Sequence, residues 1–156
     1  MIILLEGRIT KRNGNIFEGK YINGFINGKG ILKNNKGDKY VGDFYNSQKH
    51  GKGILDTLNI HYEGEFKYNK MHGKGKIIFK EEGYSYKGEF NNNEISGFGI
   101  FKWKNGDCYE GQMLNGKMNG KGIYKYKNGK IFKGNFSNGV RYNGSFYYDS
   151  VINEEI

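Results

Sequence analysis

The chain has 156 residues, of which only 36% are hydrophobic and 26 are Gly, while Pro and Ala are absent. This composition excludes an ordinary globular domain with a two-layer hydrophobic core. A formal net charge of +9 favours acidic partners, either anionic lipid headgroups or an acidic protein surface.

A short repeat runs along the chain, and an aromatic residue two positions before a glycine marks each unit. The complete units begin at Phe17, Tyr40, Tyr62, Tyr86, Tyr109 and Phe132, which sets a period of 22 to 24 residues. Residues 7–16 match the second half of a unit, so the array begins with a half repeat. Regular repetition of this length predicts stacked units that bury their apolar faces against their neighbours.

Each unit is predicted to form a β-hairpin. In YEGEF, the residues Tyr62, Gly64 and Phe66 occupy alternate positions and share one face of a strand. Asn-Gly pairs at 23–24, 115–116 and 138–139 tolerate the positive φ angles of a tight turn. A second strand follows, and its alternate residues are apolar. The glycines are expected to serve packing, because an aromatic ring can lie directly on bare backbone.

A GxG motif opens the second strand of the first five units, at 28–30, 51–53, 73–75, 97–99 and 120–122. In the last unit Asn143 and Ser145 occupy these columns, which is typical of a terminal capping unit. Two further departures, LNIH at 58–61 and Met113 in place of an aromatic residue, are expected to loosen single units without breaking the array.

These columns resemble the MORN repeat family, whose pattern is Y-x-G-x-F followed by H-G-x-G. The resemblance covers residues 7 to about 146. It implies an interaction module without catalysis of its own. In that family, repeats are appended to lipid kinases and lysine methyltransferases. They also stand alone in cytoskeletal scaffolds, in ciliary and radial-spoke components, and in proteins that bind unconventional myosin tails.

The expected fold is all-β: an elongated, single-layer antiparallel meander of about six hairpins over residues 1–149, with a short tail at 150–156. Two strands per unit at roughly 4.8 Å each predict a twisted rod on the order of 60 Å long. The end strands of such a rod expose unpaired backbone, so end-to-end pairing of two copies is a further expectation.

No residues suggest catalysis, a metal site or a cofactor. His50 and His72 share a column about 10 Å apart, which is too far for joint zinc binding within one chain. Cys108 has no neighbouring His, and GKMNGKG at 116–122 lacks the spacing of a phosphate-binding loop. We therefore expect a protein that is not an enzyme and needs no cofactor.

Compartment is predicted from the cysteine content and the N-terminus. A single Cys excludes an intramolecular disulfide and favours a reducing compartment. MIILL is too short for a signal peptide, and Ile2 excludes N-myristoylation. The expected location is cytoplasmic, in association with the cytoskeleton or peripherally with a membrane.

The aromatic column predicts a binding groove, because a single-layer sheet has no second layer to cover it. The expected groove residues are Tyr40, Phe44, Tyr62, Phe66, Tyr86, Phe90, Trp103 and Tyr109. A helical or extended protein segment, such as part of a myosin tail or of a cytoskeletal or ciliary protein, would bind there. The chain would then act as a scaffold or adaptor.

The GKG lysines predict an alternative site. Lys29, Lys52, Lys74 and Lys121 should form a basic edge at about 10 Å intervals. This edge could bind anionic phospholipid, or it could simply be a solvated edge that keeps the sheet soluble. Nucleic acid is not expected, because packing between repeats already uses the aromatic rings.

Overall fold

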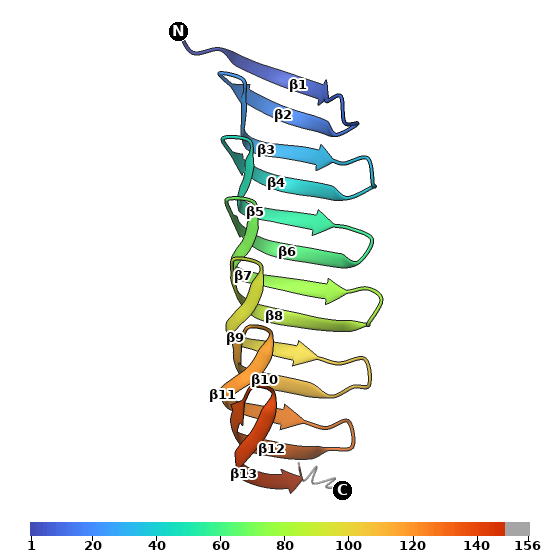
Figure 1. Cartoon of the computed structure of the whole chain (residues 1–156), viewed down its shortest axis with the longest axis vertical. Coiled ribbons are helices and arrows are strands. Elements are labelled where there is room, and N and C mark those ends of the chain that lie inside the picture. The colour runs from blue at the N-terminus through green and yellow to red at the C-terminus, as the bar shows by residue number, and fades with distance from the viewer. Residues whose placement is uncertain (149–156) are drawn as a thin grey trace, which may run out of the picture.

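The computed structural model describes residues 1–148, so the predicted tail at 150–156 lies outside the described residues. Thirteen antiparallel strands form one open sheet in which each strand pairs with its neighbours in sequence (Figure 1). The strands are β1 Leu4–Thr10, β2 Ile16–Ile22, β3 Phe25–Lys33, β4 Lys39–Tyr45, β5 Gln48–Asp56, β6 Ile60–Lys67, β7 Lys70–Phe79, β8 Tyr84–Asn91, β9 Glu94–Lys102, β10 Cys108–Leu114, β11 Lys117–Lys125, β12 Lys130–Ser137 and β13 Val140–Tyr148.

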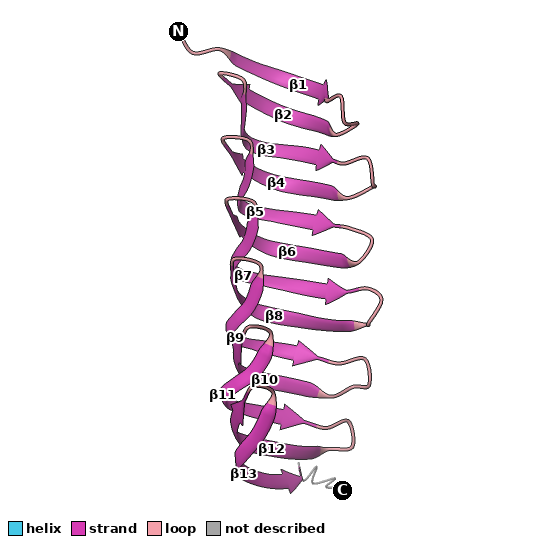
Figure 2. Ribbon diagram, in the orientation of Figure 1, coloured by secondary structure: helices cyan, strands magenta, loops and turns pink. Residues whose placement is uncertain are grey.

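Only strands and loops occur between residues 1 and 148 (Figure 2), so the predicted meander is confirmed. The strands follow one another along the long axis, and β1 and β13 lie at opposite ends of the sheet (Figure 1). In this part of the chain no helix is long and apolar enough to cross a bilayer.

Tight turns close all six complete hairpins. Both central residues of each turn have positive φ, as a two-residue hairpin turn requires. The predicted Asn-Gly pairs are confirmed, and the other three turns place Asn, Ser or Tyr in this conformation. The six pairs are Asn23–Gly24, Asn46–Ser47, Tyr68–Asn69, Asn92–Asn93, Asn115–Gly116 and Asn138–Gly139.

One glycine from every strand falls in a single row across the sheet, which we call the glycine row. Its members pair in order from β1 to β13: Gly7, Gly19, Gly30, Gly42, Gly53, Gly64, Gly75, Gly88, Gly99, Gly111, Gly122, Gly134 and Gly144. The row fixes the register of the whole array.

Aromatic rings cover one face of the glycine row. A Cβ atom on Gly64 or Gly75 would lie 2.5 Å from the hydroxyl oxygen of Tyr62, so this ring rests directly on two glycines. The Tyr62 hydroxyl donates a hydrogen bond to the carbonyl of Glu65 at 2.8 Å. The same ring meets Phe66 and Phe90 edge to face, with centroids 5.0 and 5.1 Å away. The predicted packing role of the glycines is therefore confirmed.

Each hairpin bends just beyond the glycine row. The first glycine of every GxG motif has positive φ, and the strand register shifts at the same place, as between Gly64 and Phe66. The tips therefore turn away from the main run of strands (Figure 2). Successive tips bond to one another: Asn69 donates its N–H to the Lys49 carbonyl at 2.9 Å, and its side chain accepts from the Lys49 N–H at 2.8 Å.

The last hairpin differs from the sequence prediction. Gly144, and neither Asn143 nor Ser145, continues the glycine row. The cause is a register shift of one residue between β12 and β13, whereas the shift in earlier hairpins is two residues. Met113 is buried and the sheet runs on through it, so the prediction that this departure leaves the array unbroken is confirmed.

Candidate functional site

The aromatic column does not form an open groove, and this prediction is wrong. Seven of the eight predicted residues are only 0% to 4% exposed: Tyr40, Phe44, Tyr62, Phe66, Tyr86, Phe90 and Tyr109. The eighth, Trp103, is half-buried between Phe101 and Tyr124, with ring centroids 4.6 and 5.2 Å away.

The bend of each hairpin explains this burial. The tip side of the second strand folds over the rings, and Met71, Ile95 and Met118 pack against the aromatic core. In one unit Lys49 takes this place, with its Nζ atom 5.5 Å from the centroid of the Tyr40 ring. The sheet therefore supplies its own cover, and the rings stabilise the fold.

An open groove lies on the opposite face, which we call the outer face. It has a volume of 1510 Å³ and extends from β1 to β9. Its floor is the backbone of the glycine row from Gly7 to Gly99. Because the Cβ positions of this row point towards the rings on the other face, only side chains on either side of the row form the groove walls.

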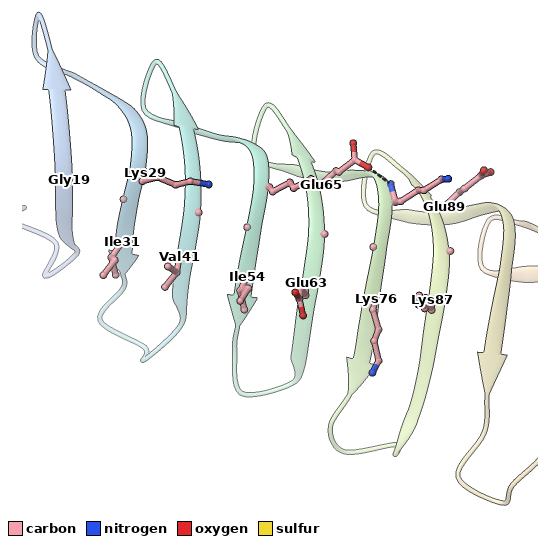
Figure 3. Close-up of a pocket in the computed structure, with 18 of the residues that line it drawn as sticks. Gly19, Lys29, Ile31, Val41, Ile54, Glu63, Glu65, Lys76, Lys87 and Glu89 are labelled. Carbon is pink, nitrogen blue, oxygen red and sulfur yellow. Dashed lines mark hydrogen bonds between the residues drawn. The ribbon is translucent and has the colours of Figure 1, made fainter.

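The first wall contains an apolar stretch followed by charges. Figure 3 shows these side chains in one line over successive strands: Ile31, Val41, Ile54, Glu63, Lys76 and Lys87. Each is paired with the next across the sheet. Val41 and Ile54 remain 38% and 39% exposed. Three apolar side chains thus face solvent together in the N-terminal half of the groove.

The second wall corrects the prediction of a uniform basic edge. Lys29, Lys52 and Lys74 do share a row, but each lies opposite an acidic residue of the next unit: Asp43, Glu65 and Glu89. Lys29 Nζ forms an ion pair with Asp43 Oδ1 at 2.7 Å. Lys121 lies beyond the groove, opposite Asn135. This row of lysines therefore lines the groove and does not form an edge of the sheet. Positive and negative side chains alternate along it.

The acidic residues of this wall also stabilise the bends, which sequence reasoning missed. Their carboxylates accept the backbone N–H that follows the bent glycine: Asp43 from Lys52 at 3.0 Å, Glu65 from Lys74 at 3.0 Å (Figure 3) and Glu89 from Phe98 at 3.1 Å. In the fifth unit the Gln112 amide accepts from Lys121 at 3.2 Å. An acidic or amide residue after each Y-x-G could have revealed this bond.

The pKa of Asp43 reflects this double role. Partial burial would raise the pKa of the carboxyl, but hydrogen bonds from the Lys29 side chain and the Lys52 backbone outweigh burial and hold it below its usual value. Asp43 is therefore charged in the folded protein and anchors both a lysine and a bend.

The other titratable candidates remain isolated. Burial raises the pKa of the Cys108 thiol even though Lys102 and Lys125 lie opposite it, so it is a weak nucleophile. The His50 ring packs 5.1 Å from the Tyr68 ring. Within residues 1–148 no three His, Cys, Asp or Glu side chains gather as metal ligands would.

Comparison with known families identifies a repeat family. The family model described as MORN repeat fits the chain at residues 17–39, 40–56, 62–83, 86–108 and 109–131. These five matches cover well over half of the chain, and each begins on the aromatic residue that opens a unit.

Proposed function

Because this chain belongs to the MORN repeat family, we propose that it is a non-catalytic scaffold that binds a segment of another protein along the groove of the outer face. Repeats of this family are associated with protein or membrane contacts. The binding site would then lie on the outer face of the sheet, opposite the buried aromatic column.

One observation carries the proposal: an open groove of 1510 Å³ with a bare glycine floor spans nine strands, β1 to β9. A polypeptide can approach such a floor closely, because the residues of this row direct their Cβ positions towards the rings and leave only backbone on the outer face. The exposed side chains of Val41 and Ile54 offer apolar contacts beside it. Grooves of this kind suit a helical or extended segment.

The cellular setting is part of the proposal. By resemblance to scaffolding members of the family, the partner would belong to the cytoskeleton, a cilium or the cortical membrane, with a myosin tail as one example. The protein would then act in the cytoplasm. Its rigid array would hold the partner segment in one orientation.

Binding of anionic phospholipid through the GKG lysines has less support. Acidic residues lie opposite Lys29, Lys52 and Lys74, which lowers the positive potential that an anionic membrane would meet. Were lipid the ligand, co-sedimentation with vesicles should require anionic lipid and weaken steeply as salt rises.

The groove can be tested by replacing an exposed apolar residue with a large charged one. Val41→Arg puts a guanidinium between Ile31 and Ile54, on the face opposite the buried rings. A photo-crosslinking residue at Ile54 should attach the partner in cytosol for the wild type and lose it for Val41→Arg.

A matched control is Tyr45→Arg, which changes an exposed residue near a hairpin tip of the same strand, outside the groove. It should leave crosslinking at Ile54 unchanged. Crosslinking that persists in Val41→Arg, with both variants folded by circular dichroism, would show that the groove is not the binding site.

A further inference from the structure

The excess of positive over negative residues is largest over residues 100–148, since residues 1–49 carry nine Lys or Arg and four acidic residues, and residues 50–99 carry seven of each. Residues 100–148 contain nine Lys or Arg residues, against only two acidic residues, Asp107 and Glu110. The ion pairs found in the described part of the chain all lie between residues 29 and 80. The cations of β9 to β12 are thus not neutralised by ion pairs within residues 1–148.

Four of these cations lie on the outer face, in line with the groove. Lys133 continues the first wall through the paired residues Ile100, Glu110 and Ile123. Lys121 continues the second wall beyond Phe98 and Gln112. Lys102 and Lys125 lie in the row beside the first wall, on the side away from the glycine row, and both are opposite Cys108. All four lysines are exposed, and we call them the basic surface.

The groove and the basic surface therefore form one path with two different chemistries. Its N-terminal part offers Ile31, Val41 and Ile54. Its C-terminal part offers lysines, and among the described residues Glu110 is the one acid between them. We propose that the partner is an amphipathic polypeptide segment with an apolar part over β3–β5 and a block of acidic residues over β9–β12. This inference rests on the proposed function of the groove.

Charge complementarity selects the acidic block. Lysines without ion pairs raise the local positive potential, which attracts anions over roughly one Debye length of about 8 Å at physiological salt. The two chemistries also orient the segment, because reversing it would place acidic residues on the apolar stretch. A polypeptide is favoured over a membrane, because the lysines continue the walls of a groove that a flat bilayer could not enter.

The spacing sets the length of the segment. From β4 to β11 there are seven strand spacings of about 4.8 Å, or about 34 Å. An extended chain covers this distance with about 10 residues, at about 3.3 Å each. A helix needs about 22 residues, at about 1.5 Å each.

The experiment is a selection of displayed random segments of about 24 residues on the folded wild-type chain, a length that covers both conformations. Enriched segments should carry Asp and Glu clustered at one end and apolar residues at the other. Their affinity should fall about tenfold or more in Lys125→Glu/Lys133→Glu, because reversing two charges repels the acidic block. Val41→Arg should also weaken them.

A matched control carries the same change in net charge elsewhere. Lys11→Glu/Lys36→Glu alters two exposed loop lysines near the N-terminal end and should change affinity by less than about twofold. A nitroxide on the acidic end of a selected segment should broaden the amide signals of Ile123 and Lys133 more than that of Ile31.

The outcomes separate the inference from the proposed function. The inference would be overturned, and groove binding left intact, by one result. The selected segments would carry no acidic block, and their affinity would fall in Val41→Arg but not in Lys125→Glu/Lys133→Glu. If no segment is enriched, or the enriched ones ignore Val41→Arg, both fail. The inference is also wrong if binding of the chain to phosphatidylserine vesicles requires Lys125 and Lys133 but binding of the selected segments does not. The basic surface would then bind lipid.

Discussion

The smallest structural unit of this protein is one aromatic ring lying on two glycines of neighbouring strands. Tyr62 on Gly64 and Gly75 is the example at the centre of the array. Its hydroxyl reaches the Glu65 carbonyl at 2.8 Å, so the ring buries apolar surface and also satisfies a backbone acceptor. Substitutions of such a ring test folding, and they cannot serve as tests of binding.

Adding one methyl group to a glycine of the glycine row should show how much this packing contributes to stability. In Gly64→Ala the new Cβ would lie 2.5 Å from both the Tyr62 hydroxyl oxygen and the Gly75 Cα, so the ring or the strand must move. We expect a loss of about 2 kcal/mol or more in the free energy of unfolding, measured by urea denaturation.

Gly7→Ala is the control for this prediction, because Gly7 belongs to the same row but no atom lies within 4 Å of an added Cβ. It should change stability by less than about 0.5 kcal/mol. Equal losses in both variants would contradict the account of the row as a packing surface.

The buried tyrosines should also make stability depend on high pH. Burial raises the pKa of Tyr109 to about 12. The pKa values of Tyr40 and Tyr62 are raised further, mainly by burial and to a smaller extent by the nearby carboxylates. The unfolded chain loses these protons near pH 10, where the folded chain still holds them. The unfolded state is therefore favoured as the pH rises from about 10 to about 12.

Urea unfolding at a series of pH values should show stability falling over this range. Tyr109→Phe should be less stable at neutral pH, because it loses the hydrogen bond to the Gln112 carbonyl at 2.8 Å. Its stability should nevertheless fall less steeply above about pH 10, since Phe does not titrate. An unchanged slope would refute the role of Tyr109.

At the scale of the element, the bend of each hairpin determines which side chains are covered. A glycine with positive φ makes the bend possible, and the carboxylate of the opposite strand accepts the next backbone N–H. This bond recurs from Asp43 to Gln112 with changing side chains, so the acceptor oxygen matters more than the charge.

Glu65→Ala should therefore loosen one bend by leaving the Lys74 N–H without its acceptor. We expect a loss of about 1 kcal/mol in the free energy of unfolding, and faster amide exchange at Lys74. Glu65→Gln should retain most of the stability, as Gln112 shows that an amide oxygen can make this bond. Glu63→Ala, an exposed change on the same strand, should have little effect; a loss as large as that of Glu65→Ala would argue against the bend bond.

At the scale of the whole molecule, the open sheet leaves two edges. Within the described residues, β1 and β13 each pair with one neighbour only. Both carry exposed apolar side chains, including Leu4 and Leu5 on β1 and Val140 and Tyr142 on β13. An unprotected edge of this kind favours pairing with another strand.

We therefore expect end-to-end association of copies at high concentration. Sedimentation velocity should show an apparent mass that increases with concentration. Leu5→Lys, which places a charge on the edge, should reduce this association, whereas Leu58→Lys in an exposed loop should not. A constant monomer mass across the concentration range would exclude association through the edges.

The sequence by itself determined the hairpins, their Asn-Gly turns and the recurring glycines of the first five units. These features depend on contacts between residues close in the chain, such as Tyr62 with Gly64 or Asn115 with Gly116, and they recur along the chain. Strand alternation also separates the side chains into two faces. The fold class could therefore be predicted from the pattern of aromatic residues and glycines alone.

Only the tertiary structure decided which of the two faces is open. The direction of the bend depends on the φ angle of the first GxG glycine and on a register shift between strands. The sequence shows where this glycine stands in each unit, but it gives neither the φ angle nor the register. The bend covers Tyr40, Tyr62 and Tyr86 and leaves Val41 and Ile54 exposed. Likewise, Lys29 and Asp43 form an ion pair because neighbouring units stack in one register, which no single unit contains.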